Sequence, residues 1–131
     1  MTHRPTRRVA VVGPTASGKS AVALHVAELT GAELISVDSM QVYRGMDIGT
    51  AKPTADEQSR VRHHLIDLVD PVDEFTVAQF QSAYRAVDAD PAILVGGTGL
   101  YHRAVIDELD LPGEWPELRA ELMTVPVEAL Y

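Results

Sequence analysis

The sequence predicts an α/β fold in which a mostly parallel sheet of about four strands carries helices on both faces. Short apolar runs rich in β-branched residues alternate along the chain with segments whose apolar residues recur at helical spacing. That alternation is typical of strand–helix–strand units, whose connecting helices cover a parallel sheet. The 131 residues, of which 46% are apolar, suffice for one modest core, so we expect a single domain over residues 1–131.

The four candidate strands are apolar runs bounded by charged residues, glycine or proline, as buried strands often are. In order they are RRVAVVG (7–13), AELISVD (32–38), HHLIDLVD (63–70) and PAILVGG (91–97). Between them, apolar spacing and polar start residues predict helices over 18–29, 54–61, 76–87 and 98–109. The turn DADP at 88–91 stops the third helix, and LPGEWP at 111–116 precedes a short terminal helix ending at Tyr131.

Composition excludes several classes of protein. No apolar run approaches the length that spans a bilayer, and the basic start MTHRPTRR lacks the apolar region of a secretory signal. The chain has no cysteine, which excludes disulfides, thiolate metal sites and cysteine nucleophiles. We therefore expect a soluble, cytoplasmic protein without a membrane partner.

The net charge of −8 is unevenly distributed along the chain. Residues 1–65 carry eight Lys and Arg against six Asp and Glu, whereas residues 66–131 carry three against thirteen. Because Lys and Arg contacts supply most of the non-specific affinity for nucleic acid, any nucleic-acid face should lie in the first half. Arg44, Lys52, Arg60 and Arg62 could form a phosphate-contacting patch there, and solvated surface charge is an equally good interpretation.

The strongest motif is GPTASGKS at 13–20, a phosphate-binding loop (P-loop) between a predicted strand and a predicted helix. Its glycines let backbone N–H groups turn inward, and the helix N-terminus adds positive potential. Lys19 would neutralise terminal phosphate oxygens and the Ser20 hydroxyl would complete the shell of Mg²⁺, the expected cofactor. The motif makes the predicted fold P-loop NTPase-like, with eight phosphate-binding residues: Gly13, Pro14, Thr15, Ala16, Ser17, Gly18, Lys19 and Ser20.

A second candidate is Asp38, which the run LISVDS delivers to the carboxyl end of a strand. Open α/β sheets bind their ligands at that edge, so the carboxylate should face the phosphate loop. It could hold Mg²⁺, act as a general base on an acceptor, or cap the turn that follows. The pattern leaves these three interpretations open.

Five stretches together resemble a known family, the tRNA dimethylallyltransferases or isopentenyl-tRNA transferases. They are GPTASGKS, ISVDSMQVYRGMDIGTAKP (35–53), HHLIDLVDP (63–71), FTVAQFQ (75–81) and LVGGTGLY (94–101), in the order of the family. The resemblance implies transfer of a dimethylallyl group from dimethylallyl diphosphate to the exocyclic amine of an adenosine next to the anticodon in tRNA. The phosphate loop would then hold a leaving group and not a phosphoryl donor.

The resemblance also implies roles for single residues. Lys19 would neutralise the departing diphosphate, and Asp38 would take the proton of the amine, with Thr98 completing the catalytic set. Tyr43 could offer a stacking face to the base, which must leave its stack to react. The implied tRNA-binding residues are Asp38, Ser39, Met40, Gln41, Thr98 and Arg119.

His63 and His64 are weaker candidates. Neighbouring residues of a strand face opposite sides, so the two imidazoles cannot both bind one metal. We expect strand-end packing or contact with tRNA phosphate from them.

Two departures from the family limit the expected activity. The segment QSAYRAVDAD (81–90) is short by roughly one to two helical turns. The chain also ends where the family continues into a helical insertion and a C-terminal helical region, so we expect a truncated, monomeric α/β domain that turns over poorly alone. A fragment, a degenerate paralogue and an internally deleted product are all open. So are a non-catalytic phosphate- or nucleotide-binding remnant and a small-molecule P-loop kinase, although the Arg-rich lid of such kinases is not found.

Overall fold

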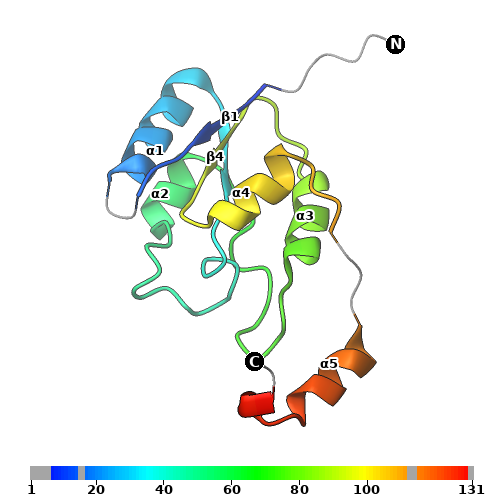
Figure 1. Ribbon diagram of the computed structural model, residues 1–131. Coiled ribbons are helices and arrows are strands. Elements are labelled where there is room, and N and C mark those ends of the chain that lie inside the picture. Colours follow the sequence, from blue (N-terminus) through cyan, green and yellow to red (C-terminus); the bar gives the residue numbers. More distant parts are fainter. Residues whose placement is uncertain (1–6, 15–16, 112–114, 130–131) are drawn as a thin grey trace.

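A four-stranded parallel sheet forms the centre of the molecule (Figure 1). The computed structural model describes residues 7–14, 17–111 and 115–129. The strands are β1 (Arg8–Val11), β2 (Glu33–Ser36), β3 (His63–His64) and β4 (Ala92–Val95). They lie in the order β1-β4-β2-β3, and every pair is parallel. The predicted class of sheet is confirmed.

The first four helices begin and end close to the predicted positions, whereas the terminal helix ends at Met123 and not near Tyr131, which lies outside the described residues. The helices are α1 (Lys19–Thr30), α2 (Ala55–Arg60), α3 (Val77–Arg85), α4 (Gly99–Ile106) and α5 (Pro116–Met123), followed by the 3₁₀ turn Val127–Ala129. Local side-chain chemistry sets several ends. Thr54 accepts a hydrogen bond from the Glu57 N–H to start α2, and Thr76 forms a capping box with Gln79 to start α3.

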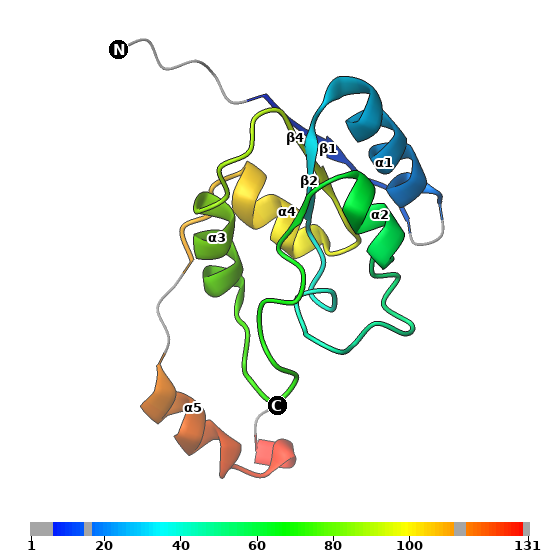
Figure 2. The ribbon, with the colours of Figure 1, turned by 180° about the vertical axis from the view of Figure 1, so that it is seen from behind.

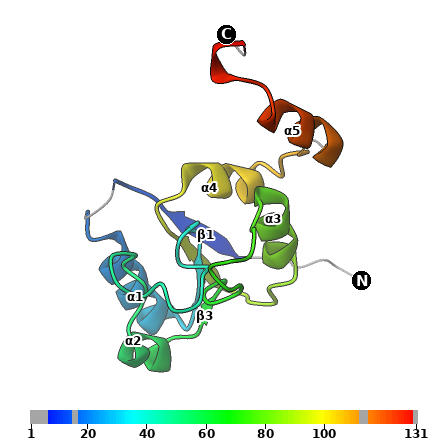
Figure 3. The same ribbon diagram turned by 90° about the horizontal axis from the view of Figure 1, so that it is seen from below.

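Helices cover both faces of the sheet, as predicted (Figure 3). On one face, α1 packs Ala23, Leu24 and Ala27 against Leu34 and Ile93 of the sheet. On the other face, residues of α3 and α4 pack against the alternate positions of β2 and β4, where Phe80 and Tyr101 stack with ring centroids 4.3 Å apart. Alternation of side chains along each strand therefore serves two separate core clusters.

The register of the two central strands decides where the functional loops meet. Glu33 pairs with Ala92 and Ser36 with Val95, so β2 and β4 end at the same level. The segments that follow them therefore leave the sheet side by side at its carboxyl edge. The phosphate loop reaches the same edge because β1 runs parallel to β4.

The third predicted strand is much shorter than HHLIDLVD, and that part of the prediction is wrong. Only His63 and His64 pair with β2. Leu65 and Asp67 adopt the left-handed backbone conformation, with φ of 65° and 54°, which a strand cannot accommodate. Further along, Val69 forms an isolated parallel β-bridge with Tyr43.

The C-terminal helix α5 lies away from the sheet in all three views of the ribbon (Figures 1, 2 and 3). None of its residues is buried. A surface ion pair of 2.8 Å between Arg119 and Glu74 joins it to the loop that precedes α3. No helix within the described ranges has the length and apolar character needed to cross a membrane.

Candidate phosphate-binding pocket

A pocket of about 500 Å³ lies at the carboxyl edge of the sheet. One wall is the phosphate-loop wall, made of residues 17–20. A second wall, which we call the loop wall, is made of Gly49, Thr50, Ala51 and Pro53. Between these walls lie Asp38, Met40 and Gln41 after β2, and Gly96 and Gly97 after β4.

The phosphate-loop wall has the local geometry of its motif. Gly18 has a φ of 82°, a left-handed conformation that glycine adopts without strain, and it leads directly into α1. Lys19 Nζ lies 3.3 Å from the Pro14 carbonyl, so the ammonium folds back over the loop. Gly13, Pro14, Ser17, Gly18 and Ser20 are exposed. Thr15 and Ala16 of the predicted loop lie outside the described residues.

Asp38 organises the turn that follows β2. Its Oδ1 accepts hydrogen bonds from the backbone N–H groups of Met40 at 2.8 Å and Gln41 at 3.2 Å. The capping interpretation of Asp38 is therefore seen in the structure. The described part of the chain donates no hydrogen bond to its Oδ2, and the side chain lines the pocket. Base and metal-ligand roles both remain compatible with that arrangement.

The turns after β2 and β4 are joined through Thr98. Its Oγ1 accepts a hydrogen bond from the Ser39 N–H at 2.9 Å and lies 3.3 Å from Ser39 Oγ. Beside it, Gly96 approaches the backbone of β2 so closely that a Cβ would lie 2.0 Å from the Val37 carbonyl oxygen. His102 of α4 supports the same turn, since its Nε2 lies 2.9 Å from the Gly96 carbonyl.

Gln41 holds the loop wall from inside. Its side chain is buried, and its Oε1 accepts a hydrogen bond of 2.7 Å from the Ser36 hydroxyl of β2. Its Nε2 donates to the carbonyls of Thr50 and Ala51, each at 3.1 Å. The amide of Gln41 is thus fully occupied within the chain, and the predicted contact of this residue with tRNA stays a prediction.

Lys52 is the centre of a polar cluster in which its own side chain is covered and its carboxylate partners face solvent. Its Nζ lies 2.6 Å from Asp47 Oδ1, 2.6 Å from Asp67 Oδ1 and 2.8 Å from the Tyr43 carbonyl. Only 4% of the Lys52 side chain is exposed. Burial lowers the pKa of Lys52, but hydrogen bonds and charge attraction from the two carboxylates outweigh it, so the pKa lies above its ordinary value.

The other three basic residues of the predicted phosphate patch are paired with carboxylates. Arg44 lies 3.2 Å from Asp70, Arg60 pairs with Glu28, and Arg62 is 3.9 Å from Glu33. The three arginine side chains are about half or more exposed, which agrees with solvated surface charge, and their contact with nucleic-acid phosphate stays a prediction. The Lys52 side chain is covered and does not belong to an exposed patch.

The side chains of His63 and His64 have different surroundings, as expected for neighbouring residues of a strand. His63 lines the pocket and its Nδ1 lies 2.8 Å from the Val61 carbonyl, whereas His64 Nε2 lies 2.7 Å from Glu33 Oε1. Burial lowers the pKa of His63, although the Val61 carbonyl and Glu57 oppose the shift. His63 therefore presents a neutral imidazole to the pocket at neutral pH.

The structure brings most of the predicted site residues together and places Tyr43 and Arg119 elsewhere. Lys19, Ser20, Asp38 and Met40 line one pocket, with Ser39 and Thr98 bonded beside it. Tyr43 packs against the core cluster of α3 and α4. Arg119 lines a different cavity on α5, together with Trp115, Leu118 and Leu122.

The fold and the pocket together define a P-loop NTPase-like α/β protein. Within that class, the chain belongs to the IPP transferase family, whose family model matches residues 41–130. The resemblance seen in the sequence is confirmed.

Relatives and solved structures agree with this assignment. The chain is 50% identical over 127 residues to a tRNA dimethylallyltransferase of Bifidobacterium longum, covering 88% of this chain and 39% of the relative. It is 54% identical over 124 residues to that of Geobacter metallireducens, covering 89% and 40%. The full-length tRNA isopentenylpyrophosphate transferase of Bacillus halodurans matches with a TM-score of 0.72 and 45% identity, over 95% of this chain and 45% of that one. The chain thus spans less than half the length of these relatives.

Proposed function

We propose that this chain forms the diphosphate-binding and amine-activating part of a tRNA dimethylallyltransferase. The carrying observation is one pocket lined by both the phosphate-loop wall and Asp38. A phosphate site alone would suit many reactions, but a carboxylate in the same pocket provides a base beside the leaving group. The family supplies the two substrates, dimethylallyl diphosphate and tRNA.

The reaction is a substitution at the allylic carbon. The bond between that carbon and the diphosphate oxygen breaks, and diphosphate leaves with the electron pair. A bond forms from the exocyclic nitrogen of adenine to the same carbon, and the nitrogen loses one proton. Lys19 and the backbone N–H groups at the start of α1 stabilise the negative charge that develops on diphosphate.

Asp38 is the group that accepts this proton. Its Oδ1 is fixed by the N–H groups of Met40 and Gln41, so the carboxylate has a defined orientation. Its Oδ2 receives no hydrogen bond from the described residues and is the atom proposed to face the amine. Thr98 accepts a hydrogen bond from the Ser39 N–H and is the third proposed catalytic residue, with Lys19 and Asp38.

Mg²⁺ is the proposed cofactor, and the donor atoms of the pocket fit it. A serine hydroxyl and a carboxylate oxygen are hard oxygen ligands of the kind that Mg²⁺ prefers. Ser20 would hold the ion together with the diphosphate, and the ion would neutralise charge on the leaving group. Asp38 Oδ2 is the alternative protein ligand.

The tRNA contacts are proposed for Ser39, Met40 and Thr98 at the pocket, and for Arg119 on α5. Met40 is 44% exposed and lines the pocket, which suits contact with a flipped base. Gln41 would contribute through backbone atoms, because its side-chain amide is occupied. The same proposal includes action as a monomer in the cytoplasm.

The test separates binding from transfer. Calorimetry with inorganic diphosphate and with dimethylallyl diphosphate, each with Mg²⁺, measures the first half of the function on the 131-residue chain. Mass spectrometry of unmodified tRNA after incubation with dimethylallyl diphosphate measures the second. Competition of the two ligands for one site is expected, and failure of the chain to bind either would overturn the proposal. Binding without any transfer, even at stoichiometric enzyme, would favour a non-catalytic remnant.

A further inference from the structure

The loop wall of the pocket is a long connection that has little regular structure of its own. Residues 37–54 join β2 to α2, and the pocket-lining part at 49–51 includes two left-handed positions, Gly49 with φ of 77° and Ala51 with φ of 53°. Alanine adopts this conformation only where its surroundings enforce it. The wall therefore needs an external support to keep its shape.

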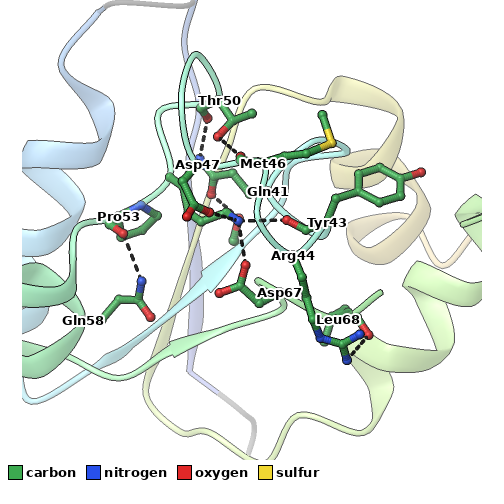
Figure 4. A network of polar contacts seen from close by, with 12 residues as sticks. Gln41, Tyr43, Arg44, Met46, Asp47, Thr50, Pro53, Gln58, Asp67 and Leu68 are labelled. Carbon is green, nitrogen blue, oxygen red and sulfur yellow. Dashed lines mark hydrogen bonds and ion pairs between the residues drawn. The ribbon is translucent and has the colours of Figure 1, made fainter. Parts of the chain in front are cut away.

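Two supports meet at this wall, and both use buried polar atoms. Gln41 binds the carbonyls of Thr50 and Ala51 and ties them to Ser36 of the sheet. Lys52 follows directly in the chain and uses all three of its donor hydrogens, on Tyr43, Asp47 and Asp67. Figure 4 shows the backbone carbonyl of Tyr43 and the carboxylates of Asp47 and Asp67 directed toward one point, beside Gln41 and Thr50.

The partners of Lys52 come from separate parts of the chain. Asp47 lies in the same connection, whereas Asp67 follows β3 and is itself left-handed, with φ of 54°. The ammonium thus joins the loop wall to the segment beyond the edge strand of the sheet. The Lys52 side chain is 4% exposed, while the carboxylates of Asp47 and Asp67 are 66% and 45% exposed, so the ammonium lies beneath two carboxylates that face solvent. Removal of both carboxylates would leave the covered ammonium without an opposite charge.

We propose that Lys52 is a positioning residue for diphosphate binding: the hydrogen bonds of its covered ammonium hold the loop wall at the distance from the phosphate loop that the ligand requires. The inference rests on the proposed function, because it assumes that the pocket takes diphosphate. Lys52 itself does not line this pocket, so it acts through Ala51 and Pro53 on either side of it.

The test compares two variants in which a basic residue is replaced by methionine. Lys52→Met keeps the apolar stem and removes the ammonium. Arg44→Met is the matched control, because Arg44 also binds one aspartate and one carbonyl but is 54% exposed and lies outside the pocket. Inorganic diphosphate affinity is measured by calorimetry well below the thermal midpoint of each variant, and far-UV circular dichroism checks that each is folded.

Lys52→Met is expected to weaken diphosphate binding by roughly tenfold while remaining folded, because small misplacements of a binding wall are costly. Arg44→Met is expected to bind as the wild type does. Equal affinity in wild type and Lys52→Met would overturn the inference while leaving the proposed function intact. No binding by the wild type would overturn both.

A milder variant decides the case in which Lys52→Met does not fold. Asp67→Asn keeps the shape of one partner and removes its charge. A folded Asp67→Asn chain with weaker diphosphate binding supports the inference. A folded chain with unchanged affinity, or a chain that also fails to fold, assigns the cluster to stability alone and overturns it.

Discussion

The two walls of the pocket are built on opposite principles. The phosphate-loop wall is exposed and has few internal contacts, chiefly those from Ser17 N–H and Lys19 Nζ to the Pro14 carbonyl, each 3.3 Å long. The loop wall is held by buried side chains, with Gln41 and Lys52 at its centre. The N–H donors of the phosphate-loop wall are thus available to an anion. The side-chain N–H donors at the loop wall are already bonded within the chain and keep that wall in shape.

This difference separates residues that should act on affinity from those that should act on geometry. Backbone and side-chain donors that lack strong internal partners are available to a charged ligand without first breaking a bond. Donors already satisfied inside the chain contribute through preorganisation. Asp38 combines both properties, because one oxygen fixes the turn and the other belongs to the pocket.

The largest effect is expected from Asp38→Asn, which removes the proposed base and keeps the shape of the side chain. Transfer to tRNA should fall by about a hundred- to ten-thousand-fold, a typical range for general bases, while diphosphate binding stays near wild type. The equivalent change in an intact relative is assayed for both properties. Loss of diphosphate and Mg²⁺ affinity in the Asn variant would instead identify Asp38 as a metal ligand.

Gly96→Ala tests the close contact between the turn after β4 and the backbone at Val37, beside the pocket. The added Cβ would lie 2.0 Å from the Val37 carbonyl, and only backbone movement can relieve that contact. We expect a loss of about 3 kcal/mol in the free energy of unfolding, at the upper end of overpacking effects. Urea denaturation measures it. Gly97→Ala is the control, because a Cβ there meets nothing within 4 Å; equal losses at the two positions would contradict the close-contact argument.

Lys19→Ala probes the phosphate-loop wall alone. A hydrogen bond to a charged group contributes roughly 1.5–3 kcal/mol, so diphosphate affinity should fall by about ten- to a hundredfold with little change in stability. Calorimetry on this variant and on Arg62→Ala, an exposed arginine outside the pocket, gives the comparison. The same affinity in Lys19→Ala and wild type would remove the phosphate loop from the proposed site.

The smallest effect concerns His63, whose pKa is lowered from its ordinary 6.5 mainly by burial. Between 6.5 and the lower folded pKa, the unfolded chain binds a proton that the folded chain does not. Stability should therefore decrease as pH falls through this window and be fully present above it. His63→Gln should flatten the pH dependence of the thermal midpoint in that range. An unchanged slope would show that other groups cause it.

Much of the fold could be predicted because it depends on local patterns. Alternating apolar runs and polar start residues such as Thr54 and Thr76 are visible in the sequence, and they form strands and helix caps where expected. The predicted length of the third strand was wrong because Leu65 and Asp67 adopt a left-handed backbone conformation. Glycine often marks such a conformation in a sequence, whereas leucine and aspartate do not.

The site could be predicted only as far as its motifs extend. GPTASGKS and Asp38 are recognisable from the chemistry they carry. The role of Lys52 depends on Asp67, fifteen residues further on, which comes near only because the chain beyond β3 turns back. The burial of Gln41 likewise follows from Ser36 and Thr50 meeting around it. Nothing in the sequence distinguishes such residues from exposed polar ones.

The position of β1 at the edge of the sheet has a consequence for how the pocket responds to its ligand. Within the described residues, β1 pairs with β4 alone, and Val9 is 62% exposed. A strand bonded on one side opens locally at a lower free energy than a central strand. Since the phosphate loop is the direct continuation of β1, an anion bound there should slow amide hydrogen exchange in Arg8–Val11 more than in β4. Amide hydrogen exchange in β1 would then report whether the phosphate loop is occupied, although the ligand does not contact β1.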